Sequence, residues 1–159
     1  MRGHLKLCLL GGIVAALAAL AALAAPAPAA DNPNGFVRNR VSLHQTMADM
    51  LKGRFYEEIK CAENCLMATR LVISGEEAAH MGFAGAKAGR WFEIGRREDV
   101  ALKAGVWTKV YLRLNAKAAA HIRAEQVSLH IAGQVVASSK ESGRHGWASW
   151  IRTCAWPRA

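Results

Sequence analysis

The chain has 159 residues, of which 52% are hydrophobic and 21% charged, and its 21 Lys and Arg residues outnumber its 12 Asp and Glu residues. This length suits one ordinary domain with a targeting segment, and it excludes a multi-domain enzyme and a polytopic membrane protein. The apolar fraction excludes an intrinsically disordered tail. The sequence therefore predicts one folded domain in a chain of net charge +9.

The N-terminal segment has the pattern of a secretory signal peptide. Arg2 and Lys6 precede an apolar run over 7–25, and Ala27 and Ala29 are small residues at the two positions that a signal peptidase requires to be small. We expect cleavage after Ala29. An uncleaved membrane anchor is the alternative, because an apolar run of about nineteen residues can just span a bilayer.

Cleavage at this point divides the chain into a signal peptide over 1–29, a flexible leader over 30–36 and a folded domain over 37–157. Loss of Arg2 and Lys6 leaves the exported part with a net charge of +7. We expect a secreted or cell-envelope protein with no membrane span after cleavage.

Three cysteines remain after export, namely Cys61, Cys65 and Cys154. In an oxidising compartment the first two are the obvious disulfide pair. Cys154 is then unpaired, and it is either buried or joined to a second chain in a dimer. A zinc site that adds His80 or Cys154 to the close pair is an alternative, but no second close pair completes the ligand set. We expect no metal and no cofactor.

Alternation of apolar and polar residues predicts short strands. Over 106–114 the side chains of Val110 and Leu112 share one face, while Lys109 and Arg113 point the other way, which is the period of a half-buried strand. Further strands are expected at 55–61, 66–73, 91–94, 127–131 and 147–154.

Short helices are predicted between the strands from their N-caps. Ser42 with Gln45 and Ser74 with Glu77 have the capping-box pattern, and Asn115 can cap the helix after the strongest strand. The helices expected are 43–51, 78–81 and 116–122. Six or seven short strands with brief helical connections are typical of an antiparallel β-sandwich.

The region from residue 50 to about 135 resembles a module that is common in exported proteins of high-GC actinobacteria. The resemblance lies in a Leu-Lys-Gly step that leads into a strand, a C-x-x-x-C motif, a second strand and a short helix. The matching segments are 51–55, 61–74, 78–83, 94–96, 102–105, 110–118 and 127–133. The resemblance implies an immunoglobulin-like β-sandwich with a Cys61–Cys65 hairpin disulfide, used as an appendage of cell-surface proteins with no assigned reaction.

The C-terminal segment contains a cluster of tryptophans. On an extended strand Trp150, Arg152 and Trp156 share one face with Cys154, while Trp147 lies on the other. These tryptophans either fill the core and cover the end of the domain, or they form an aromatic and arginine surface that stacks on sugar rings or on a partner protein.

The scattered histidines and nucleophiles do not form a recognised catalytic motif. A hydrolase that uses Cys154, with His145 as its base, or Ser149 is the weaker alternative. We predict a non-catalytic structural or adhesive module that binds a polymer or protein of the cell envelope. Its basic charge favours anionic polymers or lipid headgroups rather than nucleic acid. A soluble secreted inhibitor or ligand-binding protein is the second reading.

Overall fold

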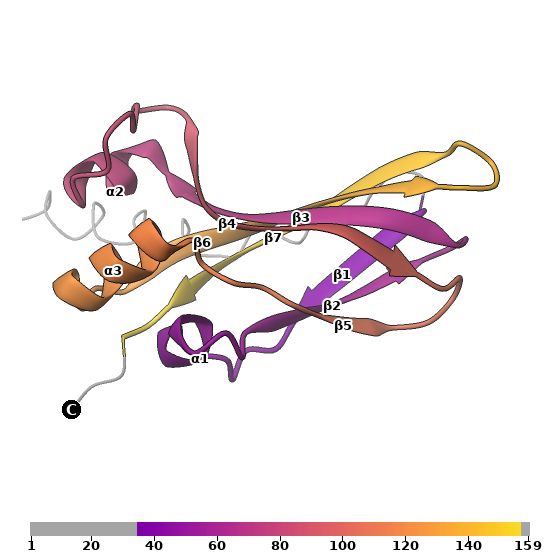
Figure 1. Ribbon diagram of the computed structural model, residues 1–159, viewed down its shortest axis with the longest axis horizontal. Coiled ribbons are helices and arrows are strands. Elements are labelled where there is room, and N and C mark those ends of the chain that lie inside the picture. Colours follow the sequence, from indigo (N-terminus) through magenta and orange to yellow (C-terminus); the bar gives the residue numbers. More distant parts are fainter. Residues whose placement is uncertain (1–34, 157–159) are drawn as a thin grey trace, which may run out of the picture.

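Two antiparallel sheets, called sheet A and sheet B, form the body of the protein in a computed structural model that describes residues 35–156 (Figure 1). The predicted signal peptide, residues 30–34 of the predicted leader and residue 157 lie outside the described residues. Sheet A has the order β1-β2-β5 and sheet B the order β4-β3-β6-β7. The strands of sheet A are β1 (Val37–Val41), β2 (Tyr56–Cys61) and β5 (Thr108–Tyr111), and those of sheet B are β3 (Cys65–Ser74), β4 (Trp91–Leu102), β6 (Leu129–Ser139) and β7 (His145–Cys154).

Three short helices lie together at one end of the two layers, on the left of Figure 1. They are α1 (Met47–Leu51), α2 (Gly75–His80) and α3 (Ala116–Glu125). The opposite end holds the connection from β2 to β3 and the hairpin between β6 and β7. The predicted class, mostly β with two antiparallel sheets and few helices, is confirmed.

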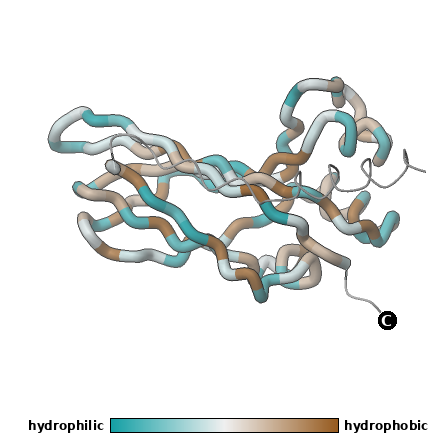
Figure 2. Tube along the Cα trace, turned by 180° about the vertical axis from the view of Figure 1, so that it is seen from behind, coloured by the Kyte–Doolittle hydropathy of each residue, from teal (hydrophilic) through white to brown (hydrophobic). Residues whose placement is uncertain are grey.

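The core lies between the sheets because alternate residues of each strand point inward. Ile59 and Val110 of sheet A face Leu71, Ile131 and Val135 of sheet B, and all of these side chains are buried. Brown and teal segments alternate along the strands in Figure 2, as expected for strands with one buried face. The second half of the predicted strand 106–114 leaves this pattern, since Leu114 pairs with Gly95 of β4 in the other sheet.

The predicted Cys61–Cys65 disulfide is present, with 6.4 Å between the two Cα atoms. Cys61 ends β2 and Cys65 begins β3, and these strands belong to different sheets. The bridge therefore joins the end of the central strand of sheet A to the start of an inner strand of sheet B, where the chain crosses between the layers, rather than closing a hairpin within one sheet.

Replacing both cysteines with serine is expected to lower the free energy of unfolding by about 2 kcal/mol, because so short a loop removes little entropy from the unfolded chain. Urea unfolding of the oxidised protein and of the Cys61→Ser/Cys65→Ser variant measures the difference. Intact mass before and after reduction must also differ by two hydrogens. Equal stabilities would show that the link between the sheets is energetically unimportant.

The helix caps are predicted correctly at two of three helices. Ser74 and Glu77 form the capping box of α2, and the side chain of Asn115 accepts from Ala118 N at α3. At α1 the prediction is wrong, because Thr46 and Asp49 form the capping box. Gln45 instead forms two hydrogen bonds with the backbone of Tyr56 at the start of β2. Its Oε1 accepts from Tyr56 N at 2.6 Å and its Nε2 donates to Tyr56 O at 2.8 Å.

Several other boundaries differ from the prediction, and the strand expected at 91–94 continues to Leu102. The strand expected at 127–131 begins at Leu129 and continues to Ser139, where small inward residues such as Gly133 and Ala137 hide the alternation. The predicted leader ends too late, because Phe36 is fully buried and its carbonyl accepts from Ala62 N at 2.8 Å.

Candidate binding surface

The tryptophan-rich strand β7 divides its side chains between the core and the outside. Trp150 is only 7% exposed and faces inward with Cys154, while Trp147 is 49% exposed on the opposite face, as alternation predicts. Arg152 also points inward and donates to the carbonyls of Ser42, Leu43 and Gln45. Trp156 is half-buried and packs against the core.

Arg152 therefore holds the segment before α1 in place, and Trp150 fills the interior. The structure does not bring Trp147, Trp150, Arg152 and Trp156 together as one exposed face. Trp147 alone of the four is largely open to solvent.

Trp150 packs against Gly133 and Phe55. It pairs with Gly133 in the register of β6 and β7, and a Cβ on residue 133 would lie 2.2 Å from its Cε2 atom. Its centroid is 5.8 Å from that of Phe55. Any larger residue at position 133 would require the Trp150 ring to shift.

A buried carboxyl group lies beside Trp150. Glu57 is fully buried between the sheets, and its Oε2 accepts from Trp150 Nε1 at 2.8 Å and from Asn39 Nδ2 at 3.5 Å. Burial raises the pKa of Glu57, since the charged form loses its solvation, and the bonds from these donors oppose the rise. The neighbouring Glu58 points outward, so the two carboxyl groups lie on opposite faces as expected.

The outer face of sheet A combines basic and aromatic side chains. Four of its side chains are Lys or Arg, and its one carboxylate, Glu58, is already paired with Arg40 at 2.7 Å. We call this surface the sheet A face, and its members are Arg38, Arg40, Tyr56, Glu58, Lys60, Lys109 and Tyr111, with Trp107 just before β5.

Two of the four cations of the sheet A face lie over aromatic rings. The Arg40 guanidinium lies over the Trp107 ring, 4.4 Å from the centroid, and Lys109 Nζ lies 4.5 Å from the centroid of Tyr56. Tyr56 and Tyr111 are cross-strand partners with 5.7 Å between their centroids. Tyr111 is 52% exposed and Trp107 is 37% exposed, so sugar rings or anions could reach this surface.

The outer face of sheet B differs in chemistry. Val136 lies opposite Trp147 in the register of β6 and β7, and both are exposed together with Ile151. On β4 the charges neutralise one another, since Arg96 pairs with Glu93 and with Glu98, at 2.8 Å in each case. The sheet A face therefore carries more net positive charge than the outer face of sheet B.

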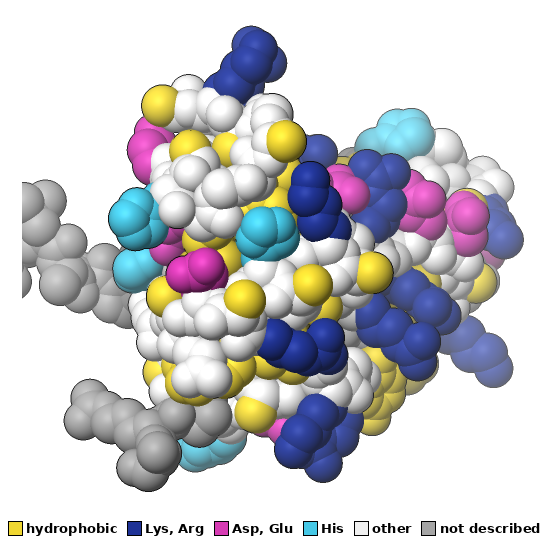
Figure 3. Space-filling view, turned by 60° about the vertical axis from the view of Figure 1, so that its left-hand side comes forward, with side chains coloured by type: hydrophobic (Ala, Val, Ile, Leu, Met, Phe, Trp, Pro, Cys, Tyr) yellow, Lys and Arg dark blue, Asp and Glu magenta, His cyan; other side chains and the backbone are white. Residues whose placement is uncertain are grey.

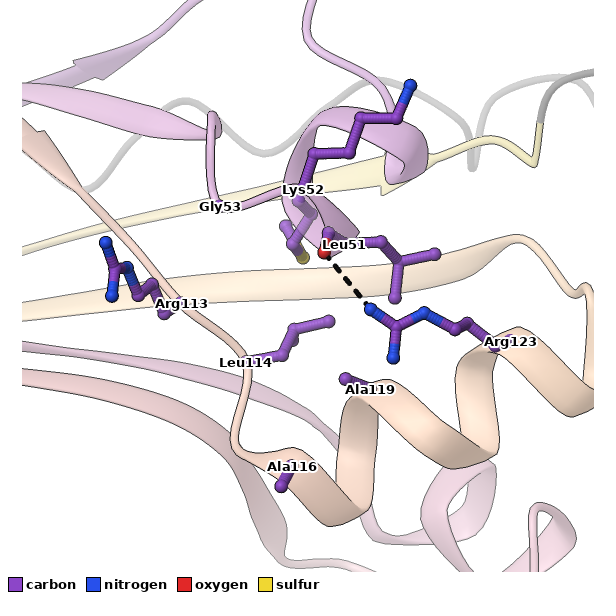
Figure 4. A pocket seen from close by; sticks show the side chains of 9 residues that line it. Leu51, Lys52, Gly53, Arg113, Leu114, Ala116, Ala119 and Arg123 are labelled. Atoms are coloured by element: carbon purple, nitrogen blue, oxygen red, sulfur yellow. Dashed lines mark hydrogen bonds between the residues drawn. The ribbon is translucent and has the colours of Figure 1, made fainter.

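A pocket of about 380 Å³ lies where α1 and α3 meet the chain after β5. Its apolar wall comes from Met50, Leu51, Leu114, Ala116 and Ala119, and its basic residues are Lys52, Arg113 and Arg123 (Figure 4). In Figure 3, which brings this end of the molecule forward, Lys and Arg side chains gather at the lower right. Arg113 lies two residues after Tyr111, just past the end of β5, so the pocket adjoins the sheet A face.

The residues of the alternative catalytic readings lie apart. Cys154 is fully buried at the end of β7, and burial raises the pKa of its thiol. His145 begins the same strand, nine residues away, a distance of about 30 Å along an extended chain. Ser149 faces outward opposite Gln134. The separation of Cys154 from His145 leaves the thiol without the base that the prediction assigned to it.

The described residues, 35–156, contain neither a cluster of metal-ligand side chains nor a membrane-spanning helix. In this range no three His, Cys, Asp or Glu side chains are grouped closely enough to hold a metal ion. No helix of the same range is long and apolar enough to cross a membrane.

Sequence reasoning missed both the sheet A face and the pocket. The signal for the face was present in the alternation of basic and aromatic residues over 107–111. The partners on β1 and β2 could not be added without the strand register. The pocket is formed by two separate stretches of the chain, 50–53 and 113–123, and no motif marks it.

Comparison with protein-family models, with curated proteins and with solved structures finds no match for this chain.

Proposed function

We propose that the protein is an exported, non-catalytic binding module of the cell envelope that holds an acidic polysaccharide on the sheet A face. The observation that carries this proposal is the sheet A face itself, where four cations stand among three aromatic rings with a single, already paired carboxylate. Cations attract acidic groups along a polymer, and the rings offer apolar surface to sugar rings.

Export is supported by the basic, apolar and small-residue pattern of residues 1–29. The Cys61–Cys65 disulfide fits the same compartment, because structural disulfides persist where the environment is oxidising. Single-stranded nucleic acid also binds basic and aromatic surfaces, but export makes it a poor partner for this protein.

An immunoglobulin-like fold and membership of the actinobacterial module are part of this proposal. Constant-type immunoglobulin domains have sheets of order 1-2-5-4 and 3-6-7 in chain order. Moving the fourth strand from the edge of the first sheet to the edge of the second gives the order β1-β2-β5 and β4-β3-β6-β7. The strand order supports the assignment on these grounds.

Co-sedimentation of the purified protein with isolated cell envelopes, from low to high salt, tests the proposal. We expect binding that weakens as salt rises, because screening reduces the attraction between exposed charges. The variant Arg38→Glu/Lys109→Glu is expected to lose this binding. The control Arg97→Glu/Lys103→Glu makes the same change in net charge on β4 and the turn after it, and it should still bind.

Equal loss of binding in both double variants would mean that only net charge matters, which contradicts a specific face. Binding that resists salt would point to the exposed apolar surface around Trp147 instead. A soluble ligand-binding protein is the second candidate function, and the pocket beside α1 and α3 favours it.

A further inference from the structure

The pocket between α1 and α3 combines positive charge with an apolar wall. Of the nine side chains drawn in Figure 4 none is acidic, and across the described part of the chain Lys52, Arg113 and Arg123 form no ion pair with a carboxylate. Its size falls in the range of small-molecule sites, about 300–1,000 Å³.

The side chains within the pocket are arranged around a central gap. Leu51, Leu114 and Ala119 face one another across it, and the Arg123 guanidinium lies at its side. Arg123 Nη2 donates to Leu51 O at 3.3 Å, which fixes the guanidinium and leaves its other N–H groups for a ligand. Arg113 and Lys52 extend outward at the rim, where they add positive potential.

We propose that this pocket binds an organic anion that carries a short hydrocarbon chain. The carboxylate or phosphate group is held by Arg123, in the fork geometry that guanidinium groups offer to such anions. The chain lies against Leu51, Leu114 and Ala119. A neutral alcohol can use only the apolar wall and an inorganic anion can use only Arg123, so a ligand that combines both groups is expected to bind more tightly than either.

Titration of the ¹⁵N-labelled protein with octanoate tests this inference, with octanol and inorganic phosphate as probes of each half. Octanoate is expected to shift the amide signals of 51–53 and 116–123 and to bind about tenfold more tightly than either other probe. Equal affinity for octanol and octanoate would overturn the proposal, and so would shifts confined to other regions.

Two variants and one control complete the test. Arg123→Gln removes the anion-binding group and is expected to weaken octanoate binding about tenfold. Ala116→Glu places a carboxylate in the apolar wall of the pocket, at the first position of α3, where a negative charge suits the helix dipole and keeps the fold intact. It should abolish binding with an unchanged melting temperature. Arg97→Gln removes one charge from β4 and should bind normally.

The same chemistry exists in a free fatty acid and in an anionic lipid. Vesicles of phosphatidylglycerol, with phosphatidylcholine vesicles as a reference, separate the two sources. Vesicle binding that Ala116→Glu abolishes would identify the lipid as the ligand, and octanoate binding without vesicle binding would identify the free acid. Octanoate affinity unchanged in both Arg123→Gln and Ala116→Glu would overturn the site.

Discussion

Replacing Trp150 with alanine is expected to lower the free energy of unfolding by about 3–5 kcal/mol, the range for removing a large aromatic side chain from a core. The ring is 7% exposed and covers Gly133, so its loss opens a cavity between the sheets. The same change leaves the buried carboxyl of Glu57 without its 2.8 Å donor. Urea unfolding followed by fluorescence or circular dichroism measures the loss.

Trp147→Ala is the matched control, because it removes the same side chain from the opposite face of the same strand. We expect a change of about 0.5 kcal/mol or less there, since Trp147 is 49% exposed. Similar losses in the two variants would contradict the assignment of Trp150 to the core.

Gly133 provides a second test of the same packing. Gly133→Ala places a methyl group against the Trp150 ring and is expected to cost about 1–3 kcal/mol through overpacking. In the Trp150→Ala background the methyl group has space, so the cost of Gly133→Ala should largely disappear. Additive losses would mean that the two residues do not meet.

Glu57→Gln is expected to gain stability over the natural protein as pH rises. Burial raises the pKa of Glu57 in the folded state, so the folded protein retains this proton at a pH where the unfolded chain has released it. The contribution of Glu57 to the free energy of unfolding is therefore most favourable below the usual glutamate pKa. It declines as the pH rises from there through the pKa of the folded state. Glutamine still accepts from Trp150 Nε1 and has no proton to release.

The difference in unfolding free energy between Glu57→Gln and the natural protein is measured by urea unfolding from pH 4 to pH 8. Each unit by which the folded-state pKa exceeds its usual value contributes about 1.4 kcal/mol to this difference. Glu58→Gln, on the outer face, removes only an exposed ion pair and should cost less than about 1 kcal/mol. A difference that does not change with pH would contradict a buried, ionisable Glu57.

Local chemistry allowed much of the fold to be predicted. The Cys61–Cys65 bridge depends on two residues close in sequence, and the caps at Ser74 and Asn115 depend on side chains within one helical turn. The two faces of β7 follow from alternation alone. Each of these features is decided within a few residues of its own position.

Features set by distant contacts were missed. Thr46, not Ser42, caps α1, because Gln45 forms hydrogen bonds with Tyr56 and because Arg152 of β7 binds the carbonyl of Gln45. The full strand 129–139 could not be recognised from its own sequence, because the glycine at 133 is explained only by its contact with the Trp150 ring. The same limitation concealed the candidate site, since Arg40 and Trp107 are brought together only by the pairing of three strands.

The binding of an acidic polysaccharide to the sheet A face is the central claim, and amide chemical-shift mapping tests it most directly. The ¹⁵N-labelled protein is titrated with oligogalacturonate at low salt, with single-stranded DNA as a competing polyanion. We predict shifts concentrated on β1, β2 and β5, a tighter interaction with the oligosaccharide, and their loss in Arg38→Glu/Lys109→Glu. Shifts centred on Val136 and Trp147 of sheet B, or tighter binding of DNA, would contradict the claim.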